Sequence, residues 1–138
     1  SKAKFMIRDC KMVAEKNKIK FKFNSYFPIQ SLNLMRGVLV AEEDGIKDQY
    51  INKIFNAIWS DGLNLNDEEV IIKVLKNIDI NPKTFLLRAQ SQNIKDQLRV
   101  KTNEAFKKGI FGAPTFVVKD KIFWGQDRLQ YAIAESVK

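Results

Sequence analysis

Apolar residues recur at three- and four-residue spacing along most of the first 108 residues, which is the period of amphipathic α-helices. This spacing predicts a series of helices, and the hydrophobic positions on each should face a shared core. The segments with this pattern are residues 1–17, a stretch from Gln30 or Ser31 to the break at Asp44-Gly45, 46–58, 66–78, 82–89 and 94–106.

Short polar motifs predict where several of these helices begin and end. The run Asn66-Asp67-Glu68-Glu69 resembles a capping box, with Asn66 as N-cap and Glu69 at the third helical position. Asn81-Pro82 is an N-cap followed by a proline at the first helical position. Gly109 comes directly after the last of the helical segments, where a glycine in the left-handed conformation commonly ends a helix.

The N-terminal segment contains the only cysteine and a stretch of alternating polar and apolar residues. Cys10 falls on the apolar stripe of the first predicted helix, so we expect a buried, structural thiol. Residues 19–24 alternate with period two, which is consistent with a short strand or with an extended crossing segment.

The hydrophobic period changes to that of β-strands near the C-terminus. Residues 115–118 and 122–124 are β-branched and aromatic, and Lys119-Asp120 lies between them as the predicted hairpin turn. Gly125-Gln126-Asp127 is expected to open a last helix, with the Asp127 carboxylate at the positive end of the helix dipole. The predicted order is therefore about six helices, a β-hairpin and a closing helix.

The composition limits the chemistry available to the chain. It contains 138 residues, one cysteine and no histidine. These counts exclude an internal disulfide, a Cys-x-x-Cys pair, Ser–His or Cys–His catalysis and most zinc sites, and we expect no metal. Any catalysis must use hydroxyls, carboxylates, amines, backbone dipoles or a cofactor that carries the reactive group.

The formal net charge of +8 is compatible with nucleic-acid or membrane-surface binding, but the lysines are spread through every segment. A solvated basic surface is the favoured interpretation, and attraction of small anionic substrates is the alternative. The chain contains no apolar run long enough to span a membrane. We expect a cytoplasmic protein with no nucleic-acid and no membrane partner.

Three short sequence runs combine glycine, proline and aromatic residues. The first is Gly-Ala-Pro-Thr-Phe at 112–116, and the second is Phe-Trp-Gly-Gln-Asp-Arg at 123–128. The third is Phe-Pro-Ile-Gln-Ser-Leu at 27–32, followed by Arg-Gly at 36–37. Together these runs resemble the 2-hydroxychromene-2-carboxylate isomerases and their relatives, the kappa-class glutathione transferases and DsbA-type oxidoreductases. Gln30 stands where that family usually has asparagine.

The resemblance implies an α/β fold, mostly helical as present, that corresponds to the C-terminal part of a thioredoxin-like DsbA-type fold. It implies a mainly helical domain over residues 1–108 and a β-β-α element over 109–138, with a cis Ala113–Pro114 bond. The family's catalytic serine belongs to a β-α-β unit that would precede Ser1. We therefore expect an N-terminally shortened member that is inactive alone, with no catalytic residue of its own.

The resemblance also implies that reduced glutathione is the cofactor. The backbone of the Ala113-Pro114 loop would pair with its cysteinyl main chain, as an added strand does. Asp127 would bind the γ-glutamyl ammonium, and Gln126 with the N–H groups at the start of the last helix would bind the α-carboxylate.

Four further residues are candidates for contact with the substrate. Trp124 is a wall of the pocket or a core or edge aromatic, and Arg128 binds a substrate carboxylate or braces Asp127. Asn33 and Arg36 face the substrate region or simply lie in solvent.

The implied function is glutathione-dependent isomerisation of a small aromatic or conjugated acid. The alternatives are a kappa-type glutathione transferase, a DsbA-like thiol-disulfide oxidoreductase, or a non-catalytic helical module that binds acidic partners. The predicted hairpin would have an open edge, so we expect a homo-oligomer or a complementing N-terminal segment to cover it.

Overall fold

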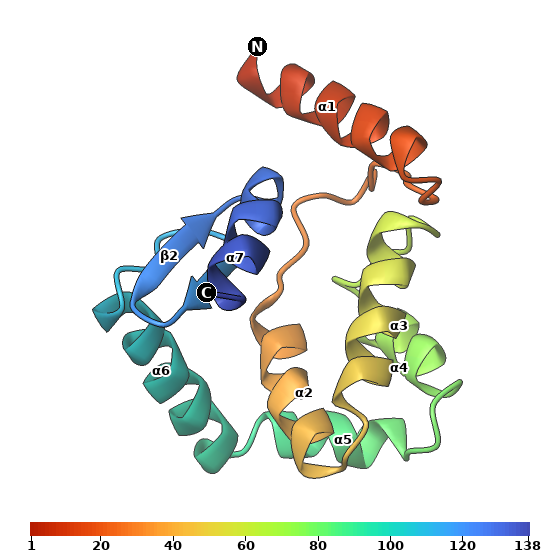
Figure 1. Ribbon diagram of the computed structural model, residues 1–138. Helices are drawn as coiled ribbons and strands as arrows, with labels where there is room; N and C mark the ends of the chain where they lie inside the picture. The colour runs from red at the N-terminus through yellow and green to blue at the C-terminus, as the bar shows by residue number, and fades with distance from the viewer. The chain divides into compact units, whose positions relative to one another are not determined.

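The computed structural model describes all 138 residues, which form two compact units, Ser1–Leu98 and Arg99–Lys138. The first unit is helical, and the second contains a two-stranded antiparallel sheet followed by the last helix (Figure 1). The elements are α1 (Lys2–Lys16), α2 (Leu32–Glu43), α3 (Lys47–Trp59), α4 (Glu68–Leu75), α5 (Pro82–Ala89), α6 (Gln92–Lys107), β1 (Thr115–Val118), β2 (Lys121–Trp124), the 3₁₀ turn η1 (Gln126–Arg128) and α7 (Leu129–Ser136). The expected boundary between residues 108 and 109 lies inside the second unit and stays a prediction.

The core of the first unit lies among α2, α3, α4 and α5. At its centre the Tyr50 and Phe85 rings lie 5.3 Å apart, and the Tyr50 hydroxyl donates a 2.8 Å hydrogen bond to the Leu34 carbonyl. Burial raises the pKa of Tyr50. Gly37 packs directly against both rings. None of the helices combines the length and apolar character that crossing a membrane requires.

Most predicted helix ends are confirmed, but the start of α4 differs by one residue. The N-cap is Asp67, whose side chain accepts a 2.9 Å hydrogen bond from the Glu69 N–H. The Asn66 side chain instead accepts from the Gln30 N–H at 2.8 Å, because the loop before α2 runs beside it. At α5 the prediction is confirmed, and Asn81 accepts from the Thr84 N–H.

The segment between α1 and α2 is extended and contains no strand, so the second of the two interpretations of residues 19–24 holds (Figure 1). It is tied to the end of α3 through polar contacts. The Lys22 N–H donates to the Trp59 carbonyl at 2.7 Å. The fully buried Asn24 side chain donates to the Ile58 and Leu63 carbonyls at 2.9 and 2.8 Å.

The expected burial of Cys10 is wrong, because its side chain is exposed. Helix α1 forms over the predicted residues, but Ala14 is its buried residue, and Met6 on the same stripe is 56% exposed. The apolar stripe of α1 borders an open cavity in place of a packed interface. An amphipathic pattern predicts which face of a helix is apolar, but it does not supply the partner that covers this face.

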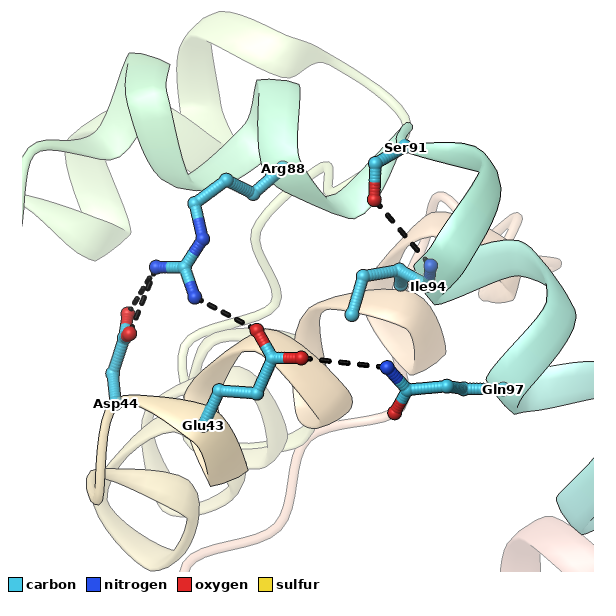
Figure 2. A network of polar contacts seen from close by, with 6 residues as sticks. All are labelled: Glu43, Asp44, Arg88, Ser91, Ile94 and Gln97. Atoms are coloured by element: carbon cyan, nitrogen blue, oxygen red, sulfur yellow. Dashed lines mark hydrogen bonds and ion pairs between the residues drawn. The ribbon is translucent and has the colours of Figure 1, made fainter.

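A charged network joins the ends of α2 and α5 (Figure 2). The Arg88 guanidinium donates to both oxygens of Asp44 at 2.8 Å and to Glu43 at 2.9 Å. These carboxylates raise the pKa of Arg88, chiefly through hydrogen bonds from its guanidinium. Gln97 on α6 donates to the other Glu43 oxygen at 3.4 Å, so the network also reaches the next helix. Its groups are partly exposed, so we expect the network to add only modestly to stability.

The second unit is built on the predicted hairpin. Strands β1 and β2 pair in a register that places Phe116 opposite Phe123, and the turn at Lys119-Asp120 is confirmed. Gly109 has φ +80°, the left-handed conformation expected at this position. Helix α7 contacts both strands, and its Glu135 accepts a 2.9 Å hydrogen bond from Lys121 on β2.

Glu135 should make the stability of the second unit depend on pH. Hydrogen bonds from Lys121 and Lys138 hold the pKa of Glu135 below its usual range. The stabilising contribution is therefore present above the ordinary glutamate pKa of about 4.3 and is lost as the pH falls through the lower, folded-state pKa. We expect Glu135→Gln to reduce the fall in melting temperature between about pH 5 and pH 2. Glu104→Gln, at an exposed position on α6, should leave this fall unchanged.

Candidate functional site

The candidate site begins at the loop that leads into β1. The Ala113–Pro114 peptide bond is cis, as the family resemblance implied, and both residues are exposed. The Thr115 hydroxyl donates to the Gly112 carbonyl and closes the loop on itself. Thr115 is therefore more than a residue with high strand propensity, since its side chain fixes the backbone that carries Ala113.

Trp124 lies on the surface beside this loop and not in a core. Its side chain is 53% exposed, and its ring lies 5.1 Å from that of Phe111 at an angle of 56°. A Cβ at Gly112 would lie 2.5 Å from the Trp124 indole nitrogen, so the absence of a side chain at Gly112 is what lets the indole rest on the loop. This exposure is incompatible with a core position for Trp124, and its role as a wall of the pocket stays a prediction.

Gly125 joins the loop to the start of the last helices. Its N–H donates to the Pro114 carbonyl at 3.0 Å. Its backbone has φ 103° and ψ 147°, a region that residues with a side chain rarely enter. The Asp127 side chain folds back over Gly125, so that a Cβ there would lie 2.5 Å from the Asp127 Oδ1 atom. This places the exposed side chains of Gln126 and Asp127 in the turn that follows directly after the contact with Pro114.

Arg128 makes the bracing contact that was one of its two predicted roles. Its guanidinium lies 3.4 Å from the Asp127 carboxylate and 5.7 Å from the centre of the Tyr131 ring. Both contacts are exposed, so they orient the arginine more than they stabilise the fold.

Asn33 and Arg36 belong to the first unit, on α2. The Arg36 guanidinium donates to the Asn33 side chain at 3.1 Å and to that of Gln90 at 3.4 Å. The Arg36 Nε atom is buried and makes no hydrogen bond. Their contact with substrate stays a prediction.

Sequence reasoning missed the two glycines that shape the site and a group of aromatic residues in the first unit. Gly112 and Gly125 stand next to Ala113 and Trp124 in the motifs, and that adjacency was the available signal. The aromatic residues are Phe21, Phe23, Phe27 and Trp59. The ring centres of the three phenylalanines each lie 6.1 Å from that of Trp59, and those of Phe23 and Phe27 lie 5.6 Å apart.

Comparison with known proteins gives a consistent result. The family model of the DsbA-like thioredoxin domain matches residues 1–134. A Sphingobium xenophagum protein named 2-hydroxychromene-2-carboxylate isomerase is 25% identical over 130 residues, which are 94% of this chain and 66% of that protein. A Pseudomonas putida protein of the same name is 29% identical over 80 residues, which are 58% of this chain and 39% of the relative.

A solved structure of a 2-hydroxychromene-2-carboxylate isomerase superposes with a TM-score of 0.86 at 22% sequence identity, over 96% of this chain and 64% of that one. At this identity the likeness shows the fold. The chain thus spans less than two thirds of the length of these relatives. Because the family model covers nearly the whole sequence, the chain belongs to the family of DsbA-like thioredoxin domains.

Proposed function

We propose that this protein is a glutathione-dependent isomerase of small aromatic or conjugated acids, of the 2-hydroxychromene-2-carboxylate isomerase type. The relatives that carry this name support the proposal, and so does the geometry of the second unit. The observation that carries it is the bond from the Gly125 N–H to the Pro114 carbonyl. This bond holds the Ala113-Pro114 loop and the Gln126-Asp127 turn next to each other.

The groups on this surface fit the parts of glutathione. The exposed backbone at Ala113 offers a peptide N–H and a carbonyl for main-chain pairing. Asp127 offers an exposed carboxylate for the ammonium group. Gln126 and the N–H groups at the start of η1 suit the α-carboxylate. Glycine is needed at positions 112 and 125, because a side chain at Gly112 would collide with Trp124 and one at Gly125 would collide with Asp127.

Glutathione, when bound, would supply the thiolate nucleophile for a conjugated substrate, chemistry that a chain without histidine obtains from a cofactor. The residues of this chain would hold and orient it. Trp124 would form one wall and limit the access of water, and Arg128 would keep the Asp127 carboxylate in place.

Asp127→Asn tests the proposal directly. Losing one charge-assisted hydrogen bond of about 1.5–3 kcal/mol should weaken glutathione binding by about tenfold to a hundredfold. Calorimetric titration of the 138-residue chain with reduced glutathione measures this change.

Asp120→Asn is the matched control, since it removes the same charge from the exposed hairpin turn of the same unit. Its affinity for glutathione should equal that of the unchanged protein. Equal affinity in the Asp127→Asn variant would contradict the assignment of the ammonium site to Asp127.

The proposal includes a partner for the free edge of β1. This strand pairs only with β2, and its other edge presents backbone groups that favour pairing with a further strand. We expect a second copy of the chain, or a separate N-terminal strand segment, to occupy it. Sedimentation equilibrium should show association, and Val117→Pro, which removes a backbone donor from β1, should weaken it. A monodisperse monomer at all concentrations would contradict pairing with a second copy.

A further inference from the structure

The net positive charge of the chain is concentrated near its N-terminus. Residues 1–23 contain eight of the 24 lysines and arginines but only two of the 16 acidic residues. From residue 24 onward, 16 basic residues stand against 14 acidic ones, so that part is close to neutral. Lysines occur along the whole chain, but most of their charge is compensated after residue 23.

Helix α1 carries five of these eight basic residues, and it is the least covered helix of its unit. Ala14 is its only buried residue, and no other helix packs along it as α2 packs against α3 and α5. Among the eight basic residues, only Lys20, after the helix, has an acidic partner, Asp61 at 3.1 Å. The five on α1 are exposed and make no ion pair: Lys2, Lys4, Arg8, Lys11 and Lys16.

The two sides of α1 have different surroundings. Met6, Ile7 and Cys10 face an apolar cavity between the helix and the end of α3. At 3.6 residues per turn, Phe5 and Met12 project from the opposite side of the helix. Their side chains are 65% and 59% exposed, so this outer side presents two large apolar groups directly to solvent.

Cations surround these two apolar groups. Arg8 stands between Phe5 and Met12 on the outer side, three residues from the first and four from the second. Asp9, which is half-buried, and the exposed Glu15 are the only acidic residues of the helix. The other cations that flank the outer side are Lys4, Lys11 and Lys16. Their long stems let the ammonium groups reach the plane of a surface that lies against Phe5 and Met12.

This combination of groups fits the surface of an anionic bilayer. Lysine and arginine attract negatively charged headgroups, while phenylalanine and methionine reach the boundary between headgroups and acyl chains. A bilayer contacts only one side of a helix, and the other side of α1 already faces the cavity in its own unit. An acidic protein groove would enclose more of the helix, and a nucleic-acid duplex would engage the cations but leave Met12 without a partner.

We propose that α1 binds anionic membranes peripherally and lies flat on the lipid surface through Phe5, Arg8 and Met12. The helix rests on the bilayer and does not cross it, since no helix of the chain is long and apolar enough to do so. This interaction is separate from the proposed glutathione chemistry, and it replaces the expectation that the protein has no membrane partner.

Vesicle binding tests the proposal with the 138-residue chain. The protein should co-sediment with vesicles of equal parts phosphatidylglycerol and phosphatidylcholine, but not with vesicles of phosphatidylcholine alone. Binding should weaken as salt rises from about 0.1 M to about 1 M, because the Debye length falls from about 10 Å to about 3 Å. No binding to the anionic vesicles, or equal binding to both kinds, would overturn the proposal.

The double variant Lys4→Gln/Arg8→Gln should bind the anionic vesicles about 25-fold more weakly. Each cation near an anionic surface contributes about fivefold in affinity, which corresponds to about 1 kcal/mol. Lys73→Gln/Lys76→Gln is the matched control, because it removes two exposed cations from the end of α4 in the same unit and should leave binding unchanged. Equal losses in both double variants would show that only net charge matters, and would overturn the assignment to α1.

The apolar contribution is tested with a second pair of variants. Phe5→Ser should weaken vesicle binding at least fivefold, because it removes a side chain that enters the lipid boundary. Leu87→Ser changes a 74% exposed apolar residue on α5 and should have no effect. Unchanged binding by Phe5→Ser would contradict the proposed contact. Both residues are exposed, so the melting temperature should stay the same in both variants.

Cysteine alkylation by iodoacetamide reports which side of α1 meets the lipid. Cys10 is the only cysteine, and it is exposed on the cavity side, so vesicles should not slow its reaction. In the variant Cys10→Ser/Met12→Cys the thiol lies on the outer side, and vesicles at ten times the Kd should slow alkylation about tenfold. Equal protection at both positions, or at neither, would overturn the proposal. Protection of the variant that rises with protein concentration without vesicles would show that a second copy covers α1, and would also overturn it.

Discussion

Gly37→Ala is expected to lower the free energy of unfolding of the helical unit by about 2–4 kcal/mol, the combined effect of overpacking and of a lost buried hydrogen bond. A Cβ at this position would overlap the Tyr50 hydroxyl and lie 2.7 Å from Tyr50 Cζ. It would also lie 3.3 Å from the Phe85 ring. Both rings are only 2% exposed, so neither can move aside without disturbing the core.

Urea unfolding followed by far-ultraviolet circular dichroism measures this effect. Gly45→Ala is the control, since Gly45 has φ +72° but no atom within 4 Å of an added Cβ, and it should cost only about 1 kcal/mol. The double variant Gly37→Ala/Tyr50→Phe should cost less than the sum of the single changes, because removal of the hydroxyl removes the worst overlap. Additive costs would show that the Tyr50 hydroxyl is not the obstacle.

The helices could be predicted from the sequence because their signals are local. Asn81-Pro82 carries its own cap, and α5 begins there as expected. The N-cap of α4 could not be predicted from local sequence alone. Asp67 and Asn66 are both competent caps, and the choice between them was made by the Gln30 N–H, which lies 36 positions away in sequence. Long-range partners of this kind leave no signal in the four residues of a capping motif.

The local geometry of the candidate site was predictable for the same reason. Pro114 and Gly125 lie in short motifs at the two ends of one hairpin, which pairs them without help from distant segments. The aromatic group that surrounds Trp59 was not predicted, because Trp59 comes from α3 and Phe23 from an extended segment that backbone and side-chain hydrogen bonds join to α3. The period-two alternation of residues 19–24 indicated one apolar side, but it did not indicate which helix that side would meet.

Gly125→Ala should disrupt the candidate site more than any change to a single binding side chain. The φ of 103° and ψ of 147° lie near a region populated almost only by glycine, and forcing another residue there costs about 1–3 kcal/mol. The added Cβ would also meet Asp127 Oδ1 at 2.5 Å. Relief of either conflict moves the Gly125 N–H away from the Pro114 carbonyl and separates the loop from the turn.

We therefore expect Gly125→Ala to weaken glutathione binding by about a hundredfold, which corresponds to about 2.7 kcal/mol. Titration calorimetry measures the affinity, and the melting temperature of the same samples shows how much of the second unit remains folded.

Gly109→Ala is the matched control. Gly109 also has positive φ, at +80°, but an added Cβ there would meet only the Ile122 side chain at an ordinary 3.6 Å. Both variants should lose some stability from backbone strain, but only Gly125→Ala should lose affinity, because only Gly125 links the Pro114 loop to the turn that carries Asp127. A similar loss of affinity in both would mean that strain anywhere in this unit is enough, and that the Gly125–Pro114 bond has no special role.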